Sequence, residues 1–208
     1  MGTAARQIIL GISGASGAAY ARRLAQCILE SGAHLHVVMT PLGRRVLAEE
    51  LDIRRPDIAA LTGRAALNAT VYAHKDLGAK IASGSFLSDG MVICPCSSNT
   101  LGALANGLGS NLLTRAAGVV LKERRRLVIV HREMPVGAIE IENMLKLSRA
   151  GAVICPASPG FYMLPRSVED LVDFVVGRVM DLLGIEHSLN TRWDPARAAE
   201  RDGAADDE

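Results

Sequence analysis

Aromatic side chains are scarce in this chain of 208 residues, which has only three Phe, three Tyr and one Trp. Proteins that bind single-stranded nucleic acid by stacking bases need more aromatics, interleaved with basic residues. Excess charge is lacking too, because 23 Lys and Arg against 22 Asp and Glu leave a net charge of +1. A protein that gains its affinity by neutralising many phosphates would be more basic. These two absences argue against nucleic acid as a partner.

Cysteine is also infrequent, and the chain has only Cys27, Cys94, Cys96 and Cys155. Their spacing is not that of a disulfide framework, so we expect reduced thiols in a cytoplasmic protein. Neither the Cys94 and Cys96 pair nor the His34 and His36 pair has the spacing of a metal site, and we expect no metal.

A long apolar segment is missing as well. Glycines within residues 11–17 interrupt the first apolar stretch, so no signal peptide is indicated. Residues 90–114 contain no Asp, Glu, Lys or Arg, but their many Ser, Asn, Gly and Thr residues exclude a membrane span. We therefore expect no membrane association.

What the chain does have is apolar material of the aliphatic kind, 49% hydrophobic with 20 glycines. Short apolar runs predict strands at 6–12, 34–39, 70–73, 91–95, 127–131 and 152–156. Helical patterns predict helices at 17–31, 42–51, 110–124, 137–149 and 167–184, with a helical stretch after residue 95 and a helical turn within 52–75. Buried strands that alternate with helices predict an α/β fold, a single-domain doubly wound parallel sheet that is Rossmann- or flavodoxin-like. We expect this domain to span residues 1–193 and a polar tail to follow at 194–208.

In such a sheet, ligands bind beyond the carboxyl ends of the strands. After the first strand, glycines in GISGASG (11–17) would let a phosphate approach the backbone and the N-terminus of a helix. The segment matches neither G-x-G-x-x-G, nor a P-loop, nor a nucleophile elbow, and a merely structural turn stays open. After the second strand, Thr40 stands where a dinucleotide site would have an acid, which favours FMN over NAD. After the third, the hydroxyl-rich residues 97–100 could bind a phosphate or simply cap a helix.

Charged and aromatic residues follow the later strands. Arg132 could clamp a phosphate and Glu133 could transfer a proton. Tyr162, beside another aromatic in a proline-bounded loop, suits a pocket wall. Arg178 interrupts an apolar helical stripe and needs an anion or a position at the rim. Lys122 shares a helical face with Arg115, which on its own is typical of a solvated surface.

Taken together, the motifs have a familiar order and spacing. They are GISGASG (11–17), SGSF (83–86), CS-x-x-T (96–100), LLTRAAGVVLKERR (112–125), RE-x-P (132–135), ENMLKL (142–147), FY-x-x-P (161–165) and DLVDFVVGRVMDLLGI (170–185). In this combination the chain, from Gly11 to Trp193, resembles the UbiX family of flavin prenyltransferases.

The resemblance implies a reaction and a set of partners. Reduced FMN and dimethylallyl phosphate combine without a metal ion to give prenylated FMN, with bonds to flavin N5 and C6. The product serves a UbiD-type decarboxylase. The resemblance also implies a homododecamer with its sites at subunit junctions.

The resemblance assigns roles to individual residues. Flavin contacts fall at Gly14, Ala15, Ser16, Thr40, Ser97, Ser98, Asn99, Thr100 and Arg132. Prenyl-phosphate contacts fall at Lys122, Tyr162 and Arg178, with Arg132 shared between the two substrates. Glu133 transfers a proton, and Trp193 walls the prenyl chain. The catalytic set is therefore Glu133, Lys122, Arg132, Tyr162 and Arg178.

The chain departs from the family pattern at four positions, of which Thr40 in place of the common Ser is a mild change. Asn99 stands where the family often has Lys, and Met163 and Leu164 follow Tyr162 where His and a basic residue are common. These changes bear on how strongly phosphate is bound.

Two other functions remain open from the residues. One is an FMN-dependent decarboxylase of the cysteine-decarboxylase type, which needs an early catalytic His, and the early candidates His34 and His74 lack supporting context. The other is a non-catalytic flavin-binding protein, which would leave the cations without a role.

Overall fold

In a computed structural model, which describes residues 5–189 and residue 191, strands and helices alternate along the chain. The strands are β1 (Gln7–Ile12), β2 (His34–Met39), β3 (Ala69–Tyr72), β4 (Gly90–Cys96), β5 (Leu127–His131) and β6 (Val153–Ile154). The helices are α1 (Ala18–Glu30), α2 (Pro41–Leu51), α3 (Ile58–Thr62), α4 (Ser98–Ala105), α5 (Leu112–Lys122), α6 (Ala138–Arg149) and α7 (Val168–Leu183), with a 3₁₀ turn η1 (Lys80–Ala82).

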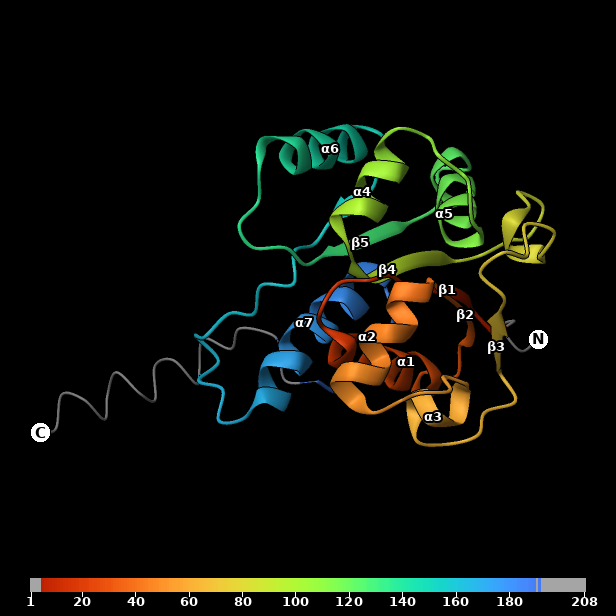
Figure 1. Ribbon diagram of the computed structural model, residues 1–208. Coiled ribbons are helices and arrows are strands. Elements are labelled where there is room, and N and C mark those ends of the chain that lie inside the picture. The colour runs from red at the N-terminus through yellow and green to blue at the C-terminus, as the bar shows by residue number, and fades with distance from the viewer. Residues whose placement is uncertain (1–4, 190, 192–208) are drawn as a thin grey trace, which may run out of the picture.

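The six strands form one parallel sheet in the order β3-β2-β1-β4-β5-β6. This is the strand order of the doubly wound Rossmann fold, so the predicted fold class is confirmed. Helices α1, α2, α3 and α7 lie on one face of the sheet, and α4, α5 and α6 lie on the other (Figure 1). Each face has its own core, one packed against α1 and α7 and the other against α5.

Helix ends follow the expected signals. Ser167 caps α7 by accepting a hydrogen bond from the backbone N–H of Asp170, and Gly184 ends that helix with a positive φ of 66°. None of the helices in the described residues is both long and apolar enough to cross a membrane.

Two strands that contain or precede a proline are irregular. β6 covers only Val153–Ile154 instead of the predicted 152–156. The backbone still follows β5, since Cys155 N–H bonds to Ile129 O and Ala157 N–H bonds to His131 O, each at 2.9 Å. In β4, the register with β5 shifts between Ile93 and Cys96, around Pro95.

Candidate functional site

The order of the strands reverses between β1 and β4, and the loops after these strands meet there. The backbone N–H and the hydroxyl of Ser13 both donate to Pro95 O, at 3.1 and 3.0 Å. The backbone N–H of Ser97 donates to Ser13 Oγ at 2.8 Å. Because α1, α2 and α4 all begin at this edge, several helix N-termini offer N–H groups and positive dipoles to a ligand.

The glycine loop after β1 is shaped by close contacts. A Cβ at Gly14 would lie 2.4 Å from the Cβ of Leu42, so only glycine fits there. Gly17 has a φ of 119°, which an L side chain rarely adopts, and it precedes α1. The predicted residues Gly14, Ala15 and Ser16 therefore lie on a tight loop, which packs against Leu42 of α2.

Glu50, which the sequence did not single out, lies at the start of α1. Its carboxylate accepts from the backbone N–H groups of Gly17 at 3.0 Å and Ala18 at 2.8 Å. A carboxylate at a helix N-terminus is favoured by the helix dipole. The available signal was indirect, because Gly17 has no side chain with which to cap α1.

Two of the predicted hydroxyl residues, Ser97 and Thr40, cap helices. Helix capping was the alternative to phosphate binding that the sequence left open for residues 97–100. Ser97 Oγ accepts from the backbone N–H of Thr100 at 3.3 Å and donates to Thr100 Oγ1 at 3.1 Å. Thr40 Oγ1 accepts from the backbone N–H of Gly43 at 2.9 Å, at the start of α2. Capping fixes both loops at the carboxyl edge of the sheet. Asn99 between them is exposed.

Arg132 and Glu133, directly after β5, reach both neighbouring loops. Arg132 Nε donates to Ser16 O at 3.1 Å. Glu133 accepts from Ser98 Oγ at 3.1 Å and from the backbone N–H of Met134 at 3.2 Å. Ser98 Oγ also lies 3.1 Å from His131 Nε2. Because the single hydroxyl proton of Ser98 goes to the carboxylate, His131 Nε2 is the donor to Ser98.

His131 itself is buried beneath this cluster. Burial is the main effect and lowers the pKa of His131, although Glu133 and Glu140 oppose the shift. The ring is therefore neutral at pH 7, and its proton on Nε2 orients Ser98. The structure thus gives Ser98 a role that the sequence did not predict, which is to hold the Glu133 carboxylate.

A second group of predicted residues gathers around α7. The Tyr162 ring lies 5.6 Å from that of Phe174 in an edge-on contact. Arg178 is one turn beyond Phe174 on the same helical face. Burial raises the pKa of Cys155, which follows β6, and the positive charge of Arg178 opposes that shift. Tyr162 and Arg178 thus both lie at α7, on the face of the sheet that this helix covers.

Lys122 is not brought to the carboxyl edge of the sheet. It is the last residue of α5, which runs back from the carboxyl edge for about 16 Å. Figure 1 shows α5 on the face of the sheet opposite α7. Lys122 forms an ion pair with Glu123 at 3.2 Å and lines a groove of about 250 Å³ with Arg115 and Gly118. Trp193, also predicted at the site, lies outside the described residues.

His74, which follows β3, and Arg44, in the first turns of α2, lie at the β2–β3 side of the carboxyl edge, near Thr40. The backbone O of His74 accepts from the N–H of Leu112 at 2.9 Å, so the residue lies by the start of α5. His74 Nδ1 is buried and has no hydrogen-bond partner within the described residues. Burial lowers the pKa of His74, and the charges of Lys75 and Arg44 lower it further. In the described part of the chain, Arg44 forms no ion pair.

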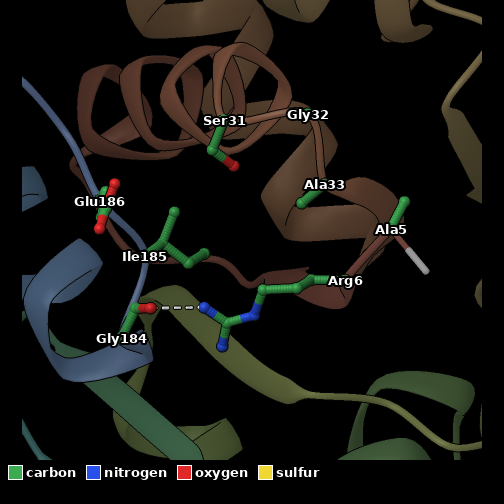
Figure 2. A pocket seen from close by; sticks show the side chains of 8 residues that line it. All are labelled: Ala5, Arg6, Ser31, Gly32, Ala33, Gly184, Ile185 and Glu186. Carbon is green, nitrogen blue, oxygen red and sulfur yellow. Dashed lines mark hydrogen bonds between the residues drawn. The ribbon is translucent and has the colours of Figure 1, made fainter. Parts of the chain in front are cut away.

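The opposite, amino edge of the sheet has a cavity of a different kind. Figure 2 shows Arg6 reaching across a cavity of about 670 Å³ to the end of α7. Its guanidinium donates to Gly184 O at 2.5 Å and to Leu183 O at 2.7 Å. A cation that caps the C-terminal carbonyls of a helix has a structural role. This cavity contains none of the predicted site residues.

Comparison with known proteins gives consistent matches. The family described as Flavoprotein matches residues 3–180. The flavin prenyltransferase UbiX of Halalkalibacterium halodurans is 50% identical over 192 residues, covering 90% of this chain and 93% of that protein. The flavin prenyltransferase UbiX of Pseudomonas aeruginosa is 47% identical over 195 residues, with the same coverage of 90% and 93%.

Two solved structures are similar over most of their length. The crystal structure of AnUbiX in complex with FMN and dimethylallyl pyrophosphate matches with a TM-score of 0.85 and 38% identity, covering 91% of this chain and 98% of that one. A dodecameric FMN-dependent UbiX-like decarboxylase from Escherichia coli O157:H7 matches with a TM-score of 0.83 and 41% identity, covering 90% and 99%.

Proposed function

This chain belongs to the UbiX family of flavin prenyltransferases, and from that premise we propose that it transfers the dimethylallyl group of dimethylallyl phosphate to reduced FMN. In the proposed reaction, the prenyl C1 becomes bonded to flavin N5 while phosphate leaves with the electron pair of the broken C–O bond, and closure onto C6 completes prenylated FMN. The observation that carries the proposal is the joined cluster of Ser16, Arg132, Ser98 and Glu133 at the carboxyl edge of the sheet.

The flavin-binding residues of the proposal lie on the loops after four strands. Gly14, Ala15 and Ser16 follow β1, Thr40 follows β2, Ser97 to Thr100 follow β4, and Arg132 follows β5. Gly14 packs closely against Leu42 at the start of α2, which fixes the loop after β1 at this edge. These features fit a flat ligand laid across the edge at the point where the strand order reverses.

Unpaired groups beside Thr40 fit the phosphate of FMN. Arg44 has no ion-pair partner and His74 Nδ1 no hydrogen-bond partner among the described residues. A buried nitrogen without a partner costs free energy, which a ligand at this position would recover. Arg44 would supply a positive charge that Asn99 does not.

For the second substrate, Arg178 and Tyr162 bind the prenyl phosphate from the α7 side and Arg132 serves both substrates. Guanidinium groups stabilise the charge that develops on departing phosphate, so no metal ion is needed for that purpose. Glu133 takes the proton released at flavin C6 or supplies one to the phosphate, because its carboxylate is held by two hydrogen-bond donors and is exposed at the edge. Trp193 completes the wall of the prenyl site.

The position of Lys122 supports an oligomeric site. Within one chain it lies at the far end of α5 from the edge, so it can join the prenyl phosphate only from a neighbouring copy. Several apolar side chains between Glu133 and the end of α6 are exposed, at Met134, Val136, Ile139, Ile141 and Leu145. Such a surface is typical of a protein contact. We therefore include a homododecamer with sites at subunit junctions.

The proposal extends to the surroundings of the enzyme. Residues 1–193 form its single domain and 194–208 a polar tail. Its product passes to a UbiD-type decarboxylase, and both proteins work in the cytoplasm.

A direct test is to incubate the purified protein anaerobically with reduced FMN and dimethylallyl phosphate, then measure the mass of the bound flavin. The expected result is a flavin heavier by one prenyl unit. Unchanged FMN that stays tightly bound would contradict the prenyltransferase and favour a flavin-binding protein. Release of CO₂ from a cysteine-type substrate without any prenyl donor would favour the decarboxylase.

A further inference from the structure

We propose that Asp181 and His187 are positioning residues that hold the guanidinium of Arg178 toward the prenyl phosphate. The inference rests on the proposed function, in which Arg178 binds the phosphate of the donor.

A chain of three hydrogen bonds connects these side chains. The backbone N–H of Leu189 donates to His187 Nδ1 at 3.1 Å. Because Nδ1 accepts this bond it carries no proton, so the ring proton is on Nε2, which lies 3.3 Å from Asp181 Oδ1 and donates to it. Asp181 Oδ2 accepts from Arg178 Nη1 at 3.2 Å. Each oxygen of the Asp181 carboxylate thus takes part in one of these three hydrogen bonds.

Along this series of hydrogen bonds, the exposed fraction of the side chains increases from His187 to Arg178. The side chain of His187 is 4% exposed, that of Asp181 is 21% exposed, and that of Arg178 is 51% exposed. A guanidinium has five N–H donors and the bond to Asp181 uses one of them. The exposed end of Arg178 therefore keeps donors for an anion while its orientation is fixed from below.

His187 itself lies beside α1. His187 lines a cavity with Arg23 and Cys27 of α1, against which α7 packs. Beside Arg178, a Cβ on Gly177 would lie 2.5 Å from Thr191 Oγ1. The segment after α7 therefore folds closely back onto the helix at the residue next to Arg178, and glycine at 177 permits that approach.

Positioning matters here because an unrestrained arginine has many rotamers. Fixing one of them costs side-chain entropy, which binding would otherwise have to supply. A guanidinium already aimed at the leaving phosphate also needs no reorganisation during bond breaking.

A purely electrostatic effect of Asp181 predicts the opposite change in donor binding from a positioning effect, so the two can be distinguished by experiment. If Asp181 acted only through its negative charge, its neutralisation would strengthen the binding of a phosphate at Arg178. If Asp181 positions Arg178, the same neutralisation weakens it. The Asp181→Asn variant distinguishes the two, because Asn keeps the size of Asp and loses the charge.

The experiment measures the KM for dimethylallyl phosphate, kcat, and the affinity of the complex with oxidised FMN for dimethylallyl phosphate by calorimetry. Oxidised FMN should not be prenylated, so binding is measured without turnover. We expect Asp181→Asn to raise the KM and the Kd of the donor about tenfold, with a smaller effect on kcat and an unchanged Kd for FMN. His187→Leu should act in the same direction, and His187→Gln, which keeps a donor and an acceptor, should restore most of the affinity.

Asp173→Asn is the matched control, because Asp173 lies on the same helix and pairs with Arg23 at 2.6 Å. It should lower the Tm and leave the KM for the donor unchanged. An unchanged or tighter Kd of Asp181→Asn for the donor would overturn the positioning role. If Asp181→Asn does not fold, the comparison of His187→Leu with His187→Gln decides, and equal donor affinities for those two variants would overturn it.

Arg178→Ala separates this inference from the proposed function. Loss of donor binding in Arg178→Ala with full binding in Asp181→Asn would overturn the positioning role alone. Full donor binding in Arg178→Ala would overturn the role of Arg178 itself, and the positioning role with it.

Discussion

At the scale of single residues, the carboxylate of Glu133 is held by a hydroxyl and a backbone amide rather than by a cation. Ser98 and the N–H of Met134 fix its two oxygens. Such bonds fix the orientation of the carboxylate for proton transfer.

We expect Glu133→Gln to slow formation of prenylated FMN on the order of 100-fold or more, since the amide cannot transfer the proton. Single-turnover kinetics under anaerobic conditions measure the rate, and the Kd for FMN should stay the same. Glu140→Gln is the control, because Glu140 only bonds to the backbone N–H of Gly137 at the start of α6. Loss of FMN binding in Glu133→Gln would mean that Glu133 holds the flavin instead.

The neighbours Arg44 and Arg45 provide a second comparison between single residues. Arg44 has no ion-pair partner in the described chain, whereas Arg45 pairs with Glu49 at 2.7 Å on the outer face of α2. We expect Arg44→Gln to weaken FMN binding about tenfold and to leave riboflavin binding unchanged, because riboflavin lacks the phosphate. Fluorescence titration of the flavin-free protein measures both.

Arg45→Gln should change neither affinity. If Arg44→Gln weakens FMN and riboflavin equally, Arg44 supports the loop rather than the phosphate.

At the scale of elements, β2 carries a buried histidine, His36, whose surroundings favour the neutral form of its ring. His36 Nε2 lies 2.9 Å from Gln7 Oε1 and Nδ1 lies 3.0 Å from the Tyr72 hydroxyl, so both ring nitrogens of the neutral ring are satisfied. The His34 ring stacks on it with centroids 4.5 Å apart. Burial, and then the charges of His34 and Lys80, lower the pKa of His36 to about 3.

This histidine should make the protein acid-sensitive. The unfolded chain binds a proton at His36 below pH 6.5, while the folded chain does so only near pH 3, so the unfolded state binds more protons in between. The free energy of unfolding should therefore fall as the pH drops through this window, by about 2 kcal/mol between pH 7 and pH 5 from His36. Urea unfolding at both pH values, compared with His36→Gln, measures the contribution. An equal fall in the variant would contradict it.

The same scale shows what the sequence could predict. Local periodicity was sufficient for the strands and for the ends of α7, because buried strands and capping residues are local features. The positions of Ser16, Ser98 and Arg132 followed once the strands were assigned, since parallel strands end at one edge. Glu50 did not follow, because only packing brings it to Gly17 and Ala18. Asp181 is within reach of Arg178 on the same helix, but its link to His187 depends on the turn after α7. The apolar run at 152–156 overestimated β6, which covers only Val153–Ile154.

At the scale of the whole molecule, the candidate site is divided between two regions of the chain. Arg132 lies at the carboxyl edge and Arg178 and Tyr162 lie at α7, whereas Lys122 lies at the end of α5 in a groove with Leu104 and Leu108. If the site forms at a junction, each junction takes Lys122 from one copy and the other residues from its neighbour. The two halves can then be supplied by different chains.

Mixed oligomers test this division. Lys122→Ala and Arg178→Ala should each be nearly inactive alone, because the departing phosphate loses one of its cations. When the two variants are co-expressed with different tags and the mixed oligomers are purified, about a quarter of the junctions should combine an intact Lys122 with an intact Arg178, as random assembly requires. The prenylation rate should then recover to about a quarter of the normal rate. Two variants purified separately and mixed without exchange should stay inactive. If both residues served the same chain, no assembly would contain an intact site, and the co-expressed oligomers would be as inactive as the single variants.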